Sequence, residues 1–508
     1  MLSKVISCGL LGIDGYIINV ETDISNGIPS FEIVGLGDTA VKEAKERVRA
    51  AIRNSGLEFP IKRITVNLAP ADLKKEGSSL DLPIAMGILS AMGNVLYNSV
   101  NNYIFAGELS LDGGIKPVKG ALSMALCALH EGIENFILAE DNAGEAAVVK
   151  GLNILPARNI RDVINHINRR NIIKVYTVNI DEIFEKNIDY ELDISDVKGQ
   201  ENVKRALEIS AAGSHSCMMS GPPGSGKTML ARRLPTILPP LTFEEALQVT
   251  KIHSIAGTLP PKTSLITTRP FRSPHHTITP VSLAGGGRYP KPGEISLAHF
   301  GILFLDELPE FDKRALEVMR QPLEDGSVTI SRLNGSITYP AKSTLILAGN
   351  PCPCGNFSDP TKKCTCSHTQ IKNYFSKLSG PLLDRVDIYI EVSSVKYEEL
   401  DCNKKGESSS VIRKRVIRAR NIQLKRYNGL KIYSNSQLKP SMINKFCSID
   451  KDCRVLIKNA FEKLGLSARG YGRVLKVART IADLEGSRDI EVNHLAEALQ
   501  YRVQYRKI

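Results

Sequence analysis

The sequence predicts an α/β protein that divides into about three domains. Short apolar runs alternate with helical periodicity through the N-terminal third of the chain. Near the middle, a glycine-rich loop joins a short apolar run to a helical one, and after residue 410 the pattern is helical only. With 508 residues, 42% of them hydrophobic, the chain is long enough to bury a core in each domain.

Composition limits the partners and the compartment. A formal net charge of +12 suits a polyanionic partner such as nucleic acid, and it suits a solvated Lys-rich surface equally well. No apolar run approaches the roughly 20 residues that span a bilayer, so we expect no membrane contact and a cytoplasmic location. Ten cysteines in so long a chain do not make a disulfide scaffold, which turns attention to metal ligation.

Residues 1–170 form the first predicted domain and contain no nucleotide-binding motif. The expected strands are Tyr16–Glu21, Ser30–Val34, Arg63–Leu68, Tyr103–Ala106 and Asn135–Ala139. The expected helices are Thr39–Ser55, Asp81–Met92 and Gly120–His130. Residues 171–192 mix Asn, Ile, Lys, Asp and Glu without a long period, which indicates a linker.

The second predicted domain, residues 193–395, contains a phosphate-binding loop. The loop matches GxxxxGK[ST] at every fixed position, between the strand-like run Ser216–Ser220 and the helical run Met229–Leu234. The glycines let backbone N–H groups surround a β-phosphate, the lysine reaches the β- and γ-phosphates, and the threonine hydroxyl can ligate Mg²⁺. We therefore expect ATP and Mg²⁺ at Gly221, Pro222, Pro223, Gly224, Ser225, Gly226, Lys227 and Thr228.

Two carboxylates follow the apolar run Gly301–Leu305, which is the arrangement of a Walker B motif. We predict that Asp306 holds Mg²⁺, usually through water, and that Glu307 polarises the attacking water. A second apolar run, Ser343–Gly349, ends at Asn350, whose amide can orient that water beside the γ-phosphate. A surface acidic pair is the alternative for the two carboxylates, and the apolar strand before them argues against it.

Two further features lie in this domain. Val328–Tyr339 alternates apolar and polar residues around an Asn-Gly turn, which predicts a β-hairpin. Two C-x-C pairs form a four-thiolate set that suits one structural Zn²⁺, although the spacing differs from the commoner C-x₂-C knuckle. The expected zinc ligands are Cys352, Cys354, Cys364 and Cys366, with His368 as a spare.

Residues 396–508 form the third predicted domain, a helical lid that follows the polar, Ser-rich loop Asp401–Ser410. The expected helices are Val411–Tyr427, Lys439–Phe446, Asp452–Leu464, Ala468–Leu484 and Glu491–Tyr501. The first of them is basic, and we interpret its cations as a solvated face in preference to a DNA-binding stripe. These cations are Arg413, Lys414, Arg415, Arg418 and Arg420.

Four segments of the second domain resemble one family of motors. They are Phe271–Thr279 (FRSPHHTIT), Leu283–Gly287 (LAGGG), Pro292–Phe311 (PGEISLAHFGILFLDELPEF) and Ser379–Val392 (SGPLLDRVDIYIEV). They are similar to the Mg-chelatase-like AAA+ ATPases, specifically the YifB/ComM family. The first domain fits that family too, whereas magnesium-chelatase motors share, in the family pattern, the middle section without it.

The resemblance assigns roles to arginines that the residues alone do not. Arg385, in the segment LLDRVD, would be an arginine finger offered to the nucleotide of a neighbouring subunit. An ion pair with Asp384 or Asp387 is the alternative. Arg469 would be the sensor 2 residue that closes the lid on the γ-phosphate, with Arg473 as the second choice.

The family also implies a ring, expected to be a hexamer, with the hairpin and the insert Arg269–Gly293 pointing into its central pore. Arg332 on the hairpin and Arg288 in the insert would then contact a DNA backbone. His275 and His276 are interpreted as residues of loop packing or of a subunit contact, because no Cys or His partner lies at ligand spacing.

The segments Glu76–Pro83 and Gly107–Val118 resemble the proteolytic domain of Lon proteases, whose fold is ribosomal S5 domain 2-like. The resemblance places Ser79 at the nucleophile, but Leu122 falls about where Lon carries its lysine base. We therefore interpret the domain as a non-proteolytic scaffold. Lys119, close by in sequence, keeps the alternative open.

Together these features imply a ring-forming ATPase that couples ATP hydrolysis to DNA translocation. By family resemblance it is a helicase that promotes branch migration in homologous recombination and natural transformation. Its expected partners are branched or single-stranded DNA and further copies of the chain. The rival is a chelatase-type motor that remodels a protein partner without DNA, and an ATP-dependent protease is the third alternative.

Overall fold

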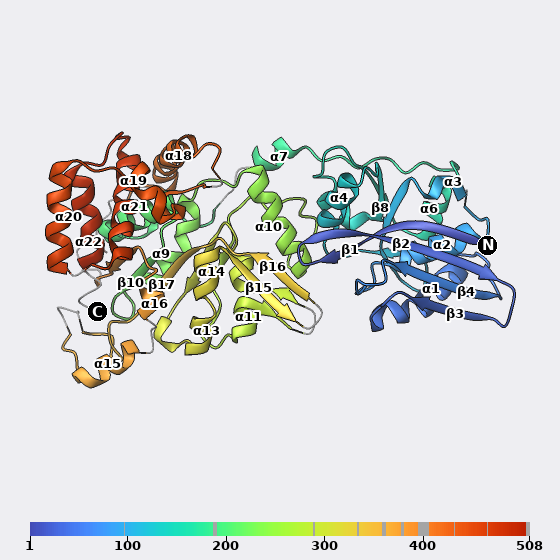
Figure 1. The fold of residues 1–508 in the computed structure, drawn as a ribbon, viewed down its shortest axis with the longest axis horizontal. Helices are drawn as coiled ribbons and strands as arrows, with labels where there is room; N and C mark the ends of the chain where they lie inside the picture. The colour runs from blue at the N-terminus through green and yellow to red at the C-terminus, as the bar shows by residue number, and fades with distance from the viewer. Residues whose placement is uncertain are drawn as a thin grey trace. The chain divides into compact units, whose positions relative to one another are not determined.

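The chain forms two compact units, each of mixed α/β structure, which confirms the predicted fold class (Figure 1). The first unit comprises Met1–Asn187 with Phe243–Thr267, and the second comprises Ile188–Thr242 with Thr268–Ile508. The computed structural model describes residues 1–95, 97–185, 190–287, 290–332, 335–357, 362–376, 380–394, 406–430, 432–464 and 466–503.

A seven-stranded mixed sheet in the order β3-β4-β2-β1-β5-β8-β9 forms the first unit. Its strands are β1 (Leu2–Leu11), β2 (Asp14–Ser25), β3 (Ser30–Val34), β4 (Arg63–Ala69), β5 (Tyr103–Ala106), β8 (Asn135–Ala139) and β9 (Asn153–Ala157), with a separate pair β6 (Glu108–Leu109) and β7 (Ile115–Lys116). Its helices are α1 (Thr39–Asn54), α2 (Asp81–Ala91), α3 (Tyr97–Val100), α4 (Ala121–His130), α5 (Ala143–Ala146), α6 (Ile160–Ile167), α7 (Ile180–Glu185) and α10 (Phe243–Ala256). Helix α2 packs on β1 and β2 and is buried throughout, which suits its continuous apolar sequence.

The position expected for a Lon-type base is apolar and inaccessible. Leu122 is fully buried in α4, where its backbone N–H donates to Glu145 Oε1 at 2.9 Å. At the start of α2, close in sequence to Ser79, the buried carboxylate of Asp81 pairs with Arg47 at 2.7 Å. Leu122 has no titratable group, so this position supplies no base for a Ser–Lys dyad.

Helix α10 packs against α4 within the first unit. Ser254 Oγ accepts the Gly120 N–H at 2.8 Å, and Lys251 pairs with Asp14 at 2.7 Å. The sequence placed these α10 residues inside the ATPase core, because they lie between two of its motifs. Contacts with residues far earlier in the chain, which no local pattern reports, group them with the N-terminal unit.

A five-stranded sheet in the order β11-β14-β17-β10-β18 organises the second unit. Its strands are β11 (Phe271–Arg272), β14 (Ile302–Leu305), β17 (Thr344–Gly349), β10 (Cys217–Ser220) and β18 (Ile388–Glu391), and all four pairings between them are parallel. Parallel pairing brings the carboxyl ends of β14, β17 and β10 to the same edge, where α/β sheets place their sites.

Short elements surround this sheet. The helices are α8 (Glu201–Gly213), α9 (Lys227–Arg233), α11 (Pro280–Ala284), α12 (Glu294–Leu297), α13 (Lys313–Glu317), α14 (Arg320–Asp325), α15 (His368–Ser376) and α16 (Gly380–Leu383), and the small pair is β12 (Gly285–Gly286) with β13 (Lys291–Pro292). The predicted hairpin is present as β15 (Ser327–Arg332) and β16 (Gly335–Pro340), with Arg332 opposite Gly335. In sequence the hairpin lies between β14 and β17, after α13 and α14.

The C-terminal helices gather into a bundle, coloured orange to red in Figure 1. They are α18 (Ser409–Arg426), α19 (Pro440–Phe446), α20 (Lys451–Leu464), α21 (Ala468–Glu485) and α22 (Val492–Val503), each within two residues of its predicted bounds. Ser467 caps α21 by accepting the Gly470 N–H at 3.1 Å. The predicted helical character of the C-terminal region is therefore confirmed.

The cations of α18 serve two purposes. Lys414 and Arg418 are exposed, as a solvated face requires. Arg415 pairs with Glu208 at 2.5 Å, and buried Arg420 donates to Ala211 O at 2.9 Å. For these two arginines the solvated interpretation is wrong, because their partners lie on α8 and fasten the lid to the ATPase core.

A buried carboxylate organises the inside of the lid. The Asp483 side chain is fully buried and accepts hydrogen bonds from Arg426 at 2.9 Å, Arg479 at 3.1 Å and Asn435 at 2.8 Å. Arg479 also donates to backbone carbonyls of the turn that follows α21. This network joins α18, α21 and the segment between α18 and α19.

We predict that Asp483→Ala destabilises the second unit by about 3–5 kcal/mol, because it leaves guanidinium groups without their carboxylate in the lid interior. Urea unfolding of the purified protein measures the change. Glu462→Ala, at an exposed acid on α20, is the matched control and should change stability by no more than about 0.5 kcal/mol. Equal unfolding midpoints for the two variants would contradict a structural role for the network.

Candidate active site

The loop after β10 wraps around the ammonium of Lys227, the first residue of α9. Lys227 is only 8% exposed and donates to the carbonyl oxygens of Gly221 at 2.7 Å and Pro222 at 2.9 Å. Burial lowers the pKa of Lys227, and the negative charges of Asp306 and Glu307 oppose that effect. The loop thus holds a cation at the edge of the sheet, close to the two Walker carboxylates.

The three glycines of the loop are required for different structural reasons. Gly224 and Gly226 have φ of +78° and +90°, a left-handed conformation that L-residues with a side chain rarely adopt. Gly221 is limited by space, since a Cβ there would lie 2.2 Å from the Val392 carbonyl oxygen. The pattern read from the sequence therefore corresponds to real backbone constraints in this chain.

Thr228 and Asp306 meet across the sheet edge. The Thr228 hydroxyl donates to Asp306 Oδ2 at 2.5 Å, which joins α9 to the end of β14. A hydroxyl and a carboxylate oxygen are the ligand types that Mg²⁺ takes in phosphate sites. The residues fit the predicted magnesium site in both chemistry and position.

Glu307 has an unusual backbone and a partner that the sequence did not reveal. Its φ is +52°, its side chain is 61% exposed, and its N–H donates to Asp306 Oδ1 at 2.9 Å. Glu307 Oε2 lies 3.5 Å from His276 Nδ1, and the rings of His275 and His276 lie 4.0 Å apart. A left-handed glutamate stores strain of the kind that clusters at active sites, and it directs this carboxylate beside the histidine pair.

Asn350 connects the end of β17 to the loop. Its Oδ1 lies 3.3 Å from Lys227 Nζ, so it can accept a hydrogen bond from the ammonium. Asn350 also lines a pocket of about 460 Å³ together with Glu307, Glu310, Pro353, Gln370, Asn373 and Tyr374. Gln370, Asn373 and Tyr374 come from α15, and no motif in the sequence singled them out.

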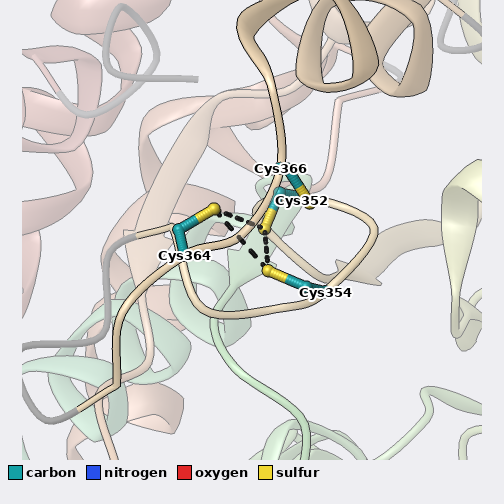
Figure 2. A group of neighbouring side chains, drawn as sticks. All are labelled: Cys352, Cys354, Cys364 and Cys366. Carbon is teal, nitrogen blue, oxygen red and sulfur yellow. Dashed lines mark hydrogen bonds between the residues drawn. The ribbon is translucent and has the colours of Figure 1, made fainter.

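The cysteine set forms one cluster. Figure 2 shows Cys352, Cys354 and Cys364 in mutual contact. The Cys352 sulfur lies 3.3 Å from that of Cys354 and 3.7 Å from that of Cys364, and the latter two lie 3.6 Å apart. All four cysteine sulfurs lie within 4.8 Å of one another. Four sulfurs around one Zn²⁺ at about 2.3 Å would lie about 3.8 Å apart, so the set fits a tetrahedral site. Backbone N–H groups of Asn356 and Thr365 and the Cys352 thiol lower the pKa of Cys354 to about 5, which favours a thiolate ligand.

The cysteine segment packs on the phosphate-binding loop. It begins two residues after Asn350, and a Cβ at Gly355 would lie 2.3 Å from Cδ of Pro223. Gly355 has a φ of +80°, so both its conformation and its close approach require glycine. The cysteine cluster thus adjoins the site from two sides, through Asn350 and through Pro223.

The remaining predicted site residues lie apart from this group. The Arg385 side chain, 13% exposed, pairs with Glu324 of α14, a partner that the sequence did not suggest. Arg469 is exposed on the first turn of α21, where Arg473 donates to Asp387 Oδ1 at 2.8 Å. Arg332 lies on β15, and Arg288 lies outside the described residues.

Comparison with known proteins identifies the family. Residues 193–400 match the model for magnesium chelatase, subunit ChlI, while residues 20–142 and 406–502 match those for subunit ChlI of Mg-chelatase and its C-terminal part. The chain is 42% identical to the competence protein ComM of Haemophilus influenzae, over 99% of this chain and 98% of that protein. The chain belongs to the YifB/ComM family of magnesium-chelatase-like AAA+ ATPases. It is also 43% identical to the uncharacterized protein YifB of Salmonella typhimurium, over 97% of this chain and 95% of that protein.

The YifB/ComM assignment agrees with the site at the carboxyl ends of β10, β14 and β17, because AAA+ ATPases bind ATP at a phosphate-binding loop beside Walker B carboxylates. A Lon protease of Rhizobium meliloti is 24% identical over 166 residues, 30% of this chain and 20% of that protein, in keeping with the Lon-like N-terminal region. Among the described helices, none is both long enough and apolar enough to cross a membrane.

We predict that Gly355→Ala destabilises the second unit more than Gly429→Ala does. Both glycines have φ near +80°, at +80° and +79°, but a Cβ at Gly429 meets nothing within 4 Å. The left-handed conformation should cost each variant about 1–3 kcal/mol, and only Gly355→Ala also displaces Pro223. Thermal unfolding measures the difference, and equal losses in the two variants would show that the Pro223 contact carries no energy.

Proposed function

We propose that this protein is a ring-forming ATPase that uses ATP hydrolysis to move DNA, a helicase that promotes branch migration in homologous recombination and natural transformation. The observation that carries the ATPase part is the meeting of Lys227, the Thr228–Asp306 pair and Asn350 at one edge of the sheet. These groups come from three parallel strand ends and match the parts that phosphoryl transfer requires.

Each side chain has a distinct role in the proposed hydrolysis. Lys227 binds the β- and γ-phosphate oxygens of ATP, and Thr228 and Asp306 hold Mg²⁺, which neutralises phosphate charge when it is bound. Glu307 polarises the attacking water, and Asn350 orients that water beside the γ-phosphate.

The contribution of a second subunit follows from the family. Arg385 would reach the nucleotide of a neighbouring copy as an arginine finger, and Arg469 would close the lid on its own subunit's γ-phosphate. Glu324, which pairs with Arg385 within one chain, would release it on assembly. A ring, and by family resemblance a hexamer, provides such neighbours for every subunit.

Three observations support DNA as the polymer that is moved. A relative aligned over nearly the full length is named a competence protein, the chain carries a net charge of +12, and the β15–β16 hairpin lies in sequence between β14 and β17, two of the three strands that end at the site. Arg332 and Arg288 are the proposed contacts to DNA phosphates.

The cysteine cluster is proposed to hold one structural Zn²⁺ through Cys352, Cys354, Cys364 and Cys366. A structural site uses four protein ligands and leaves no position for a reactive water. Zinc would supply a crosslink that fixes the segment beside Asn350 and Pro223.

The match of three segments to magnesium chelatase subunits favours a second candidate, a motor that remodels a protein partner without DNA. Incubating the purified protein with ATP and a labelled four-way DNA junction separates the two. ATP-dependent resolution of the junction into duplex products supports the helicase. An active ATPase that neither binds nor resolves the junction would favour the protein remodeller.

We predict that Glu307→Gln keeps ATP binding but reduces steady-state hydrolysis by at least about a hundredfold, because it removes the group that polarises water and leaves Asp306 in place. Lys227→Ala should weaken ATP binding instead. Binding of a fluorescent ATP analogue and phosphate release measure the two effects. Wild-type turnover in the Glu307 variant would refute its assignment.

We predict one zinc ion per chain in protein purified without chelator, as measured by elemental analysis. The double change Cys354→Ser with Cys364→Ser should remove the metal, because two oxygen donors replace two thiolates. Cys127→Ser, outside the cluster, is the control and should keep the full zinc content. Metal-free wild-type protein that folds normally would contradict the zinc site.

We predict that Arg332→Ala weakens binding to all DNA sequences alike and lowers the salt slope of binding by about one unit, since a phosphate contact carries no base information. Basal ATPase should survive, because no catalytic group is removed. Arg418→Ala, at an exposed arginine of α18, is the charge-matched control. Junction unwinding at the wild-type rate in the Arg332 variant would leave the hairpin as a structural element.

A further inference from the structure

Arg473 connects the lid to the segment that carries Arg385. It lies on α21, one helical turn after Arg469, and its guanidinium donates to the backbone carbonyl of Arg385 and to Asp387 Oδ1 at 2.8 Å. Residues four apart lie on the same face of a helix. Arg469 and Arg473 therefore lie on one face of α21, where Arg469 is exposed and Arg473 contacts the Arg385 segment.

The same carbonyl is held from a second direction. Ser216, which directly precedes β10, donates its hydroxyl to Arg385 O at 2.8 Å. In return the Asp387 N–H donates to Ser216 Oγ at 3.1 Å. The peptide group after Arg385 is thus fixed between the lid and the strand that leads into the phosphate-binding loop.

Asp387 provides a buried anion for this contact. Burial opposes its ionisation, but the hydrogen bond with His215 at 3.0 Å and the charge of Arg473 hold the pKa of Asp387 well below its usual range. His215 in turn contacts the Thr480 hydroxyl at 2.7 Å, farther along α21. Helix α21 therefore engages the start of β18 through two points, Arg473 directly and Thr480 through His215.

The Arg385 side chain and the Arg385 backbone have different partners. It pairs with Glu324 of α14, an acid that is 52% exposed. The backbone carbonyl of Arg385 thus accepts two partly buried hydrogen bonds, of which the one from Arg473 is charge-assisted, while its side chain pairs with an acid that faces solvent. The backbone contacts thus hold the base of the side chain, and Glu324 pairs with its guanidinium.

We propose that Arg473 is a positioning residue, which sets where one subunit presents Arg385 to the nucleotide of its neighbour. This inference rests on the proposed function of Arg385 in trans. Because α21 is one continuous helix, a lid movement sensed at Arg469 also moves the hydrogen bond to Arg385. Arg473 would then act through the finger and would not contact ATP itself.

Mixed assemblies of two disabled subunits test this. The donor carries Lys227→Ala and offers the finger, and the acceptor carries Arg385→Ala and keeps its phosphate-binding loop. Active interfaces in the mixture pair the donor's finger with the acceptor's loop. Adding Arg473→Ala to the donor should lower the recovered kcat at least about tenfold and leave KM for ATP unchanged, because the acceptor's own site is intact.

Two further donors control for folding. Lys476→Ala removes a cation from the same helix, whose hydrogen bond at 2.9 Å goes to Ser436 O within the lid, and it should retain the recovered activity. Arg473→Lys keeps the charge but replaces the planar guanidinium, whose Nη1 makes both contacts, with a shorter ammonium, so an intermediate loss is expected. Size-exclusion chromatography verifies that each donor assembles.

The outcomes are distinct. Loss of activity when Arg473→Ala is placed in the acceptor, in place of the donor, would assign Arg473 to its own subunit's nucleotide and overturn the proposal. Equal activity of the Arg473→Ala and parental donors would also overturn it. Absence of activity in the parental mixture would refute the finger in trans, and with it both the proposed role of Arg385 and this inference.

Discussion

The site depends on the hydrogen bonds that the Lys227 ammonium donates. Held by carbonyls of its own loop and by Asn350, the ammonium ties the end of β10 to the end of β17, while Thr228 ties the same loop to β14 through Asp306. Parallel pairing makes this possible, because it brings three strand ends from distant parts of the chain to one edge.

Much of this site could be predicted from the sequence, because its chemistry is local. The phosphate-binding loop, the pair Asp306 and Glu307, Asn350 and the two C-x-C pairs each follow or contain a short pattern with a physical reason. The longer helices of the C-terminal bundle were equally predictable, since a helical period over a dozen or more residues leaves little choice of structure. The boundary residues differ by one or two positions, as helix ends do.

The features that could not be predicted from the sequence depend on contacts between segments that lie far apart in the chain. Nothing near His276 in the sequence indicates Glu307, and nothing near Arg385 indicates Glu324 or Arg473 as its neighbours. The pocket residues Gln370, Asn373 and Tyr374 follow the cysteine cluster without a motif of their own. The contacts of helix α10 could not be predicted for the same reason, since its partners in α4 lie more than a hundred residues earlier. Local periodicity predicts that a helix or strand forms, whereas the tertiary fold determines which other segments it contacts.

The most direct test concerns the Thr228–Asp306 pair, because the proposed site holds Mg²⁺ and ATP together only if these groups act as one. The measurement is the affinity for a fluorescent ATP analogue with and without Mg²⁺, in the wild-type protein and in Thr228→Val, which keeps the side-chain shape. Mg²⁺ should tighten binding in the wild type, and the tightening should be lost in the variant while metal-free binding persists. The same Mg²⁺ effect in both proteins would contradict the site proposed at this edge of the sheet.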